Sequence, residues 1–209
     1  MSKDVMRCFL SEENLTLHQR ECEKMKSRLS IYEKSLPKIK NMSIKDVRLS
    51  RIDKDYKEDI LYLKRYLMLH SVYFSSFSEK KRAPSKLLHY FSSREALAYE
   101  CLLAMKEASH GFLCLYKTNG APRISILSAE SQSLIDPPTL CIEISEHAYF
   151  LDYLFDRERY FKSCLEFLNV SMLFTSSSDN KVAEATNSRE EASPQGLYSS
   201  YQRPHQRAS

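Results

Sequence analysis

Apolar positions in the first part of the chain recur at alternating spacings of three and four residues. This spacing places side chains on one stripe of an α-helix. Ser11 suits the N-cap of such a helix, and Pro37 suits its stop. We therefore predict a helix over residues 12–36. Its stripe consists of Leu15, His18, Cys22, Met25, Leu29, Tyr32 and Leu36.

A second and longer helix is predicted over residues 44–78, where Ser43 followed by Asp46 resembles a capping box. Its main stripe consists of Tyr56, Ile60, Leu63, Leu67, His70, Phe74 and Phe77, and a second stripe of Tyr62, Tyr66, Leu69 and Tyr73 lies beside it. A coiled-coil seam needs only about two positions in seven. Burying each large side chain is worth roughly 1.5–3 kcal/mol. The wide face must therefore be covered, and we predict that both stripes bind a partner.

The pattern changes after residue 92. A helix over residues 93–109 ends before Gly111, and strand-like runs follow at 112–117, 123–128 and 139–145. Asn119 and Gly120 between the first two runs indicate a hairpin, and a last helix is expected over residues 146–169. We therefore predict an α+β fold: an N-terminal hairpin or coiled coil of long helices, an α-β-β-β-α unit with a three-stranded antiparallel sheet, and a disordered tail.

These elements predict four regions. Residues 1–78 form the helical region, and residues 79–92 form a basic linker. Residues 93–174 form the small α+β domain. Residues 175–209 are rich in Ser and Thr without any apolar period, which is typical of a disordered tail.

Composition excludes some classes of enzyme. The 209 residues include only three glycines, and the two nearest ones are nine positions apart. Loops that cradle phosphates need several neighbouring glycines, so nucleotide-binding loops of that kind are excluded. Residues 1–94 hold 21 Lys and Arg against 12 Asp and Glu. This basic half suits an anionic partner, although solvated helix faces are also rich in charge.

The six cysteines are widely spaced and form no CxxC pair. Neither a secretory signal nor an apolar run of about 18–20 residues is present. We therefore expect a cytoplasmic or nuclear protein with reduced cysteines, rather than a secreted one.

Two groups of residues have the types that metal sites use. His18 and Cys22 lie one helical turn apart, but zinc would need two more ligands, and only Cys8 is nearby. An acidic cluster surrounds a histidine near the end of the sheet, a set that metal-assisted hydrolysis also uses. It consists of Glu143, Glu146, His147, Asp152 and Asp156. Strand alternation would point Glu143 to solvent, and basic residues follow at once. We therefore interpret the first group as helix packing and the second as surface ion pairs, and predict neither a metal nor a cofactor.

The densest basic patch consists of Lys80, Lys81, Arg82 and Lys86. We interpret this patch as part of a solvated linker. The alternative is that it contacts phosphates or serves as a nuclear-import signal.

The order of elements is similar to the coiled-coil-plus-RWD layout of several kinetochore subunits, which implies a structural role. We therefore predict a non-enzymatic interaction or scaffold subunit of a cytoskeletal, centrosomal, ciliary or chromosomal assembly. Its protein partner, or a second copy, would bind helices 12–36 and 44–78. One alternative is a nucleic-acid-binding accessory protein that uses residues 34–94. A more remote alternative is a small hydrolase or transferase built around His147.

Overall fold

The computed structural model describes residues 2–79, 85–117 and 121–174. Its helices are α1 (Ser2–Met6), α2 (Glu12–Ser35), α3 (Ile44–Leu49), α4 (Lys54–Ser75), α5 (Ser85–Tyr90), α6 (Arg94–Lys106), α7 (Phe150–Tyr153) and α8 (Arg157–Phe167). Its strands are β1 (Phe112–Tyr116), β2 (Arg123–Leu127) and β3 (Leu140–Glu143), and its short 3-10 helices are η1 (Pro37–Asn41), η2 (Glu146–Ala148) and η3 (Val170–Leu173). The predicted α+β class is confirmed. The predicted disordered tail and most of the basic patch lie outside the described residues.

The three strands form one antiparallel sheet in the order β2-β1-β3. The central strand β1 pairs with both neighbours, and Phe112 lies opposite Leu127 on one side and Glu143 on the other. All four residues of β3 are buried, because this edge strand packs against α4. The main chain of β3 is also tied to α4, since the Cys141 N–H donates to Ser76 Oγ at 2.8 Å.

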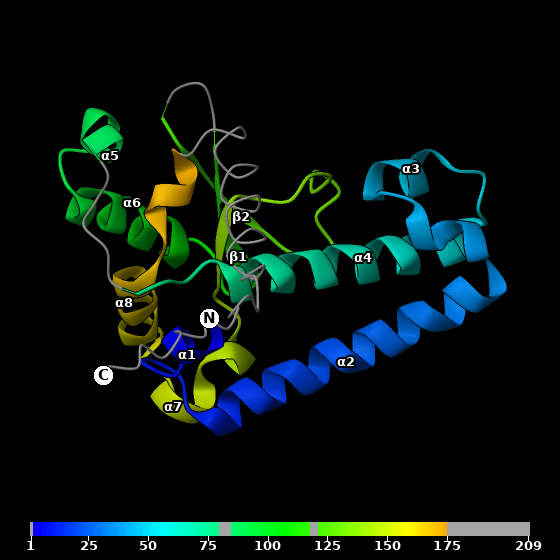
Figure 1. Cartoon of the computed structure of the whole chain (residues 1–209), viewed down its shortest axis with the longest axis horizontal. Coiled ribbons are helices and arrows are strands. Elements are labelled where there is room, and N and C mark those ends of the chain that lie inside the picture. Colours follow the sequence, from blue (N-terminus) through cyan, green and yellow to red (C-terminus); the bar gives the residue numbers. More distant parts are fainter. Residues whose placement is uncertain (1, 80–84, 118–120, 175–209) are drawn as a thin grey trace, which may run out of the picture. The chain divides into compact units, whose positions relative to one another are not determined.

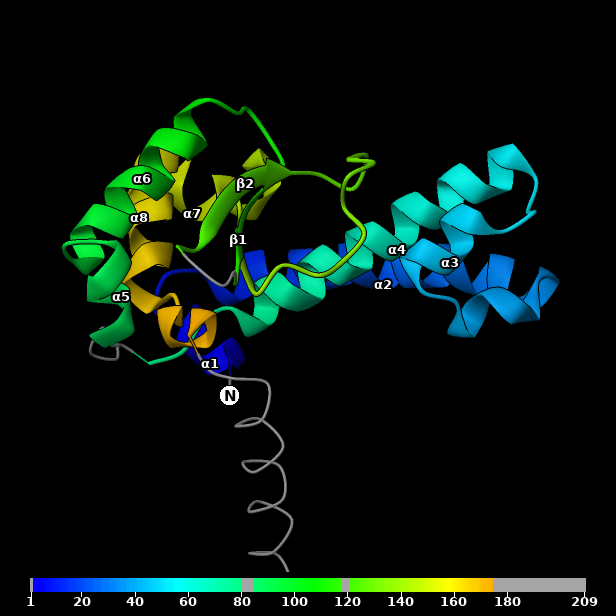
Figure 2. The same ribbon diagram turned by 90° about the horizontal axis from the view of Figure 1, so that it is seen from above.

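The helices α2 and α4 pack against each other as the predicted hairpin, and Figures 1 and 2 show them side by side with α3 at the end away from the sheet. The predicted second helix is interrupted, however. The first part of the predicted helix forms the short helix α3, which has the expected capping box of Ser43 and Asp46. The chain then leaves the helix at Ser50, and Asp53 caps the separate helix α4. Residues 44–78 are therefore two helices rather than one.

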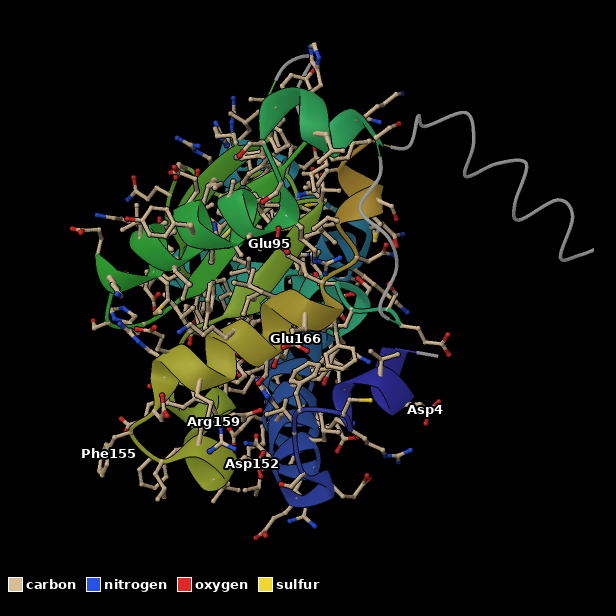
Figure 3. All side chains as sticks on the ribbon, turned by 90° about the vertical axis from the view of Figure 1, so that its left-hand side faces the viewer. Asp4, Glu95, Asp152, Phe155, Arg159 and Glu166 are labelled. Atoms are coloured by element: carbon tan, nitrogen blue, oxygen red, sulfur yellow. The ribbon has the colours of Figure 1, made fainter. Side chains whose placement is uncertain are left out.

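The predicted last helix is also interrupted. Residues 146–169 form η2, α7 and α8, and the break falls at Leu154, which has a φ of 51°. This left-handed conformation is costly for a leucine. Phe155 next to it is 86% exposed and points away from the ribbon in Figure 3. Asp156 then caps α8 by accepting a hydrogen bond from the Arg159 N–H.

Two apolar clusters cover most of the wide face of α4. Leu69, Tyr73 and Phe77 belong to the larger cluster around the sheet. Ile60 and Leu63 belong to a smaller cluster formed by α2, η1, α3 and α4.

The rest of that face is only partly covered. Leu67, Phe74, Tyr62 and Tyr66 are half-buried, and Tyr56 is 56% exposed. Binding of a partner to these residues stays a prediction, but burial of most of the stripe needs no partner. The division into domains also stays a prediction, although residues 1–174 form one compact unit. Among the described residues, no helix has the length and apolarity that a membrane crossing requires.

Candidate metal centre

Four side chains from distant parts of the chain meet between α2, α4 and β3. They are His18 of α2, His70 of α4, Glu143 at the end of β3 and His147 of η2. One ligand atom from each lies within 4.8 Å of all the others. The first three side chains are at most 2% exposed, whereas the His147 side chain is 50% exposed.

Hydrogen bonds at the ends of these elements hold the four residues close together. Ser11 caps the start of helix α2, and its side chain accepts a hydrogen bond from the Asn14 N–H. Asp152 of α7 accepts hydrogen bonds from the Ser11 N–H and the Asn14 side chain. This contact fixes the start of α2, about two turns before His18, against the segment that follows His147. Tyr160 Oη donates to the Glu143 carbonyl at 2.9 Å and anchors the end of β3.

Glu143 is the centre of the cluster. Its Oε2 atom lies 2.6 Å from His18 Nε2 and 3.4 Å from His70 Nε2, and its Oε1 atom lies 2.8 Å from His147 Nε2. Burial alone would raise the pKa of Glu143, but the hydrogen bonds from His147 and His18 outweigh it and hold this pKa well below its usual range. The hydrogen bond to Glu143 likewise raises the pKa of His147 against the opposing effect of burial.

The histidine nitrogens show that a cation fits this cluster. His70 Nδ1 lies 2.8 Å from the carbonyl oxygen of Tyr66, which can only accept, so the proton of the neutral ring is on Nδ1. His70 Nε2 then presents a lone pair toward the Glu143 carboxylate, and it is buried without a hydrogen-bond partner. Two facing acceptors repel each other unless a proton on His70 Nε2 or a metal cation lies between them. His18 Nδ1 is likewise buried without a partner among the described residues.

Three imidazoles and one carboxylate form a donor set that binds first-row transition metals. From the sequence, His18 with Cys22 was interpreted as helix packing and the acidic cluster around His147 as surface ion pairs. That interpretation missed that members of the two groups meet in one site. His18 belongs to the same candidate ligand set as His70, and Cys22 is not part of that set. Glu143 is 1% exposed and does not face solvent as strand alternation had suggested. Of the predicted acidic cluster, only Glu143 and His147 belong to the four-residue group.

A cavity of about 400 Å³ lies between α2 and α4, and His70 forms part of its wall together with Cys22, Lys26 and Phe74. The cavity therefore reaches one of the four candidate ligands from the surface. Lys26 on its wall is exposed, and no hydrogen bond or ion pair of Lys26 occurs within the described part of the chain.

Residues 79–175 match the family model of the iron/manganese superoxide dismutases, C-terminal domain. The match covers slightly less than half of the chain and includes Glu143 and His147, whereas His18 and His70 lie before it. A comparison with curated proteins finds no match.

The family match and the histidine–glutamate cluster contradict the prediction of a non-enzymatic scaffold subunit. They also overturn the alternative of a nucleic-acid-binding accessory protein and the alternative of a hydrolase around His147. The similarity of element order to kinetochore subunits was misleading, because the order of elements alone does not define a function. Among the residues of the basic patch, only Lys86 is described, and it is exposed on α5.

Proposed function

We propose that this protein is a metal-dependent oxidoreductase of the iron/manganese superoxide dismutase type. The observation that carries the proposal is the convergence of His18, His70, Glu143 and His147, which brings four suitable ligand atoms within 4.8 Å of one another. The family match of residues 79–175 favours iron or manganese over other metals.

The four residues would hold the metal through the Nε2 atoms of the histidines and the carboxylate of Glu143. When bound, iron or manganese would supply one-electron redox chemistry, in which one superoxide is oxidised to dioxygen and another is reduced, with two protons, to hydrogen peroxide. Because its pKa is lowered, Glu143 is ionised at neutral pH. Its negative charge offsets part of the charge of a divalent or trivalent ion, which the neutral imidazoles do not.

The cavity between α2 and α4 supports a small substrate. Its volume of about 400 Å³ lies at the lower end of the range of small-molecule pockets. Lys26 on its wall adds a positive charge, which favours an anion such as superoxide. All six cysteines are unpaired, and we keep the cytoplasm as the proposed compartment on that basis.

The proposal is tested by purifying the full chain and measuring bound iron, manganese and zinc together with the rate of superoxide removal. We expect about one iron or manganese ion per chain and activity well above that of the free metal. His18→Ala should lose both. His110→Ala removes an exposed histidine outside the cluster and should keep both.

Two outcomes would contradict the proposal. An unchanged metal content in His18→Ala would show that the cluster is not the metal-binding site. A wild-type protein that binds only zinc, or that binds iron or manganese without removing superoxide, would show a metal site without the proposed reaction.

A further inference from the structure

The ring of Tyr66 lies directly on the ring of His70. Their centroids are 3.9 Å apart and their planes are inclined by 28°, so the two rings are stacked. This is the closest of the aromatic contacts between described residues. Tyr66 precedes His70 by one turn of α4, and its carbonyl oxygen also accepts the hydrogen bond from His70 Nδ1.

The other neighbours of His70 approach it by their edges. His18 lies at 5.3 Å and 74°, and Phe112 lies at 5.2 Å and 78°. The Tyr66 ring is therefore the one stacked partner of His70 in the described part of the chain. Without it, the imidazole would have free space over one face and could tilt away from the point at which the four ligand atoms meet.

We propose that Tyr66 is a positioning residue for the candidate metal ligand His70, and that its ring fixes the direction of the His70 Nε2 lone pair. This inference rests on the proposed function, because it requires that the cluster binds a metal.

The stack, rather than the hydroxyl group, is what the proposal requires. Tyr66→Phe keeps the ring and the backbone carbonyl, whereas Tyr66→Leu keeps the carbonyl and much of the volume but removes the stack. Tyr62 offers a matched control. It is half-buried on the same helix, and its ring centroid lies 6.1 Å from that of Tyr66. Within the described part of the chain it makes no hydrogen bond, ion pair or ring contact with the four candidate ligands.

The test uses Co²⁺ as a spectroscopic probe of the full-length protein, with the dissociation constant and the visible absorption bands as readouts. We expect Tyr66→Leu to bind Co²⁺ about 10-fold more weakly, within the range of about 10–100-fold that loss of a residue supporting a ligand typically costs. Its bands should shift because the His70 ring is no longer held. Tyr66→Phe and Tyr62→Leu should keep the wild-type bands and bind within about twofold of the wild type.

Unfolding of the metal-free variants in urea separates positioning from packing, since Tyr66→Leu and Tyr62→Leu both remove a half-buried ring. Unchanged Co²⁺ bands and affinity in Tyr66→Leu would overturn the positioning role and leave the proposed function intact. Equal changes in Tyr62→Leu would show a general effect of packing and would also overturn it. Failure of the wild-type protein to bind Co²⁺, Mn²⁺ or Fe²⁺ would overturn both proposals.

Discussion

Replacement of Glu143 by Gln removes the one negative charge of the candidate metal centre while keeping its shape. In the wild type, the carboxylate lies 2.6 Å from His18 Nε2 and 2.8 Å from His147 Nε2. Loss of a residue that merely supports a ligand costs about 10–100-fold in metal affinity. Loss of the anionic ligand itself should therefore cost more than about 100-fold, or about 2.8 kcal/mol at 1.4 kcal/mol per tenfold change.

The assay is competition between the protein and a chelator for Mn²⁺, carried out on the wild type and on Glu143→Gln. Glu107→Gln is the control, because Glu107 is exposed at the end of α6 and lies outside the cluster. Circular dichroism verifies that the variants fold. A dissociation constant of Glu143→Gln within about threefold of the wild-type value would refute the assignment of Glu143 as a ligand.

Three further predictions concern stability, measured by urea denaturation of the metal-free protein. Leu63→Ala should lower the free energy of unfolding by about 2–5 kcal/mol because Leu63 is fully buried. The control Leu49→Ala changes a side chain that is 74% exposed, and it should alter this free energy by no more than about 0.5 kcal/mol. Equal effects of the two substitutions would contradict the assigned packing. The pair of Glu143 and His147 should stabilise the fold most between about pH 4.5 and pH 6.5, the ordinary pKa values of the two groups. The contribution of His147, whose pKa is raised, is lost as the pH rises through its folded pKa, and that of Glu143, whose pKa is lowered, is lost as the pH falls through its folded pKa; Glu143→Gln should flatten this profile. Gly111→Ala should destabilise the fold by at least about 1–3 kcal/mol, because Gly111 has a φ of 104° and an added Cβ would lie 2.7 Å from a carbonyl oxygen of β2; unchanged stability would show that the turn can relax.

The fold was largely predictable because its signals are local. The capping box at Ser43 and Asp46 and the N-caps at Ser11 and Ser93 appear in the structure as hydrogen bonds between residues three apart. The strand runs likewise contain the residues that form the sheet. The break near Ser50 was not predicted, since the apolar spacing continues across it through Leu49, Ile52 and Tyr56. The break near Leu154 was missed although four charged residues, 156–159, interrupt the apolar spacing there.

The candidate site was not predictable in the same way, because its residues are separated by up to about 130 positions in the chain. Each was noticed in isolation: His18 and His70 on apolar stripes, and Glu143 and His147 in an acidic cluster. A histidine at a buried helix position needs a polar partner, and two such histidines were present on two helices predicted to pack together. That coincidence was the available signal. The identity of the partner, Glu143, follows only from the position of β3 beside α4.

The candidate metal centre contains residues from two regions of the chain, and this leads to a last prediction. His18 and His70 come from the helical hairpin, whereas Glu143 and His147 come from the α+β unit. A metal that binds the folded protein and not the unfolded chain stabilises it by about 2.7 kcal/mol at a free concentration of 100 times the dissociation constant. Urea denaturation with and without Mn²⁺ should show this gain in the wild type and in His110→Ala. His18→Ala should show none, because the hairpin then supplies only one ligand. A gain of the same size in His18→Ala would mean that Mn²⁺ stabilises the protein at some other place, and the link between metal binding and the packing of hairpin against sheet would be wrong.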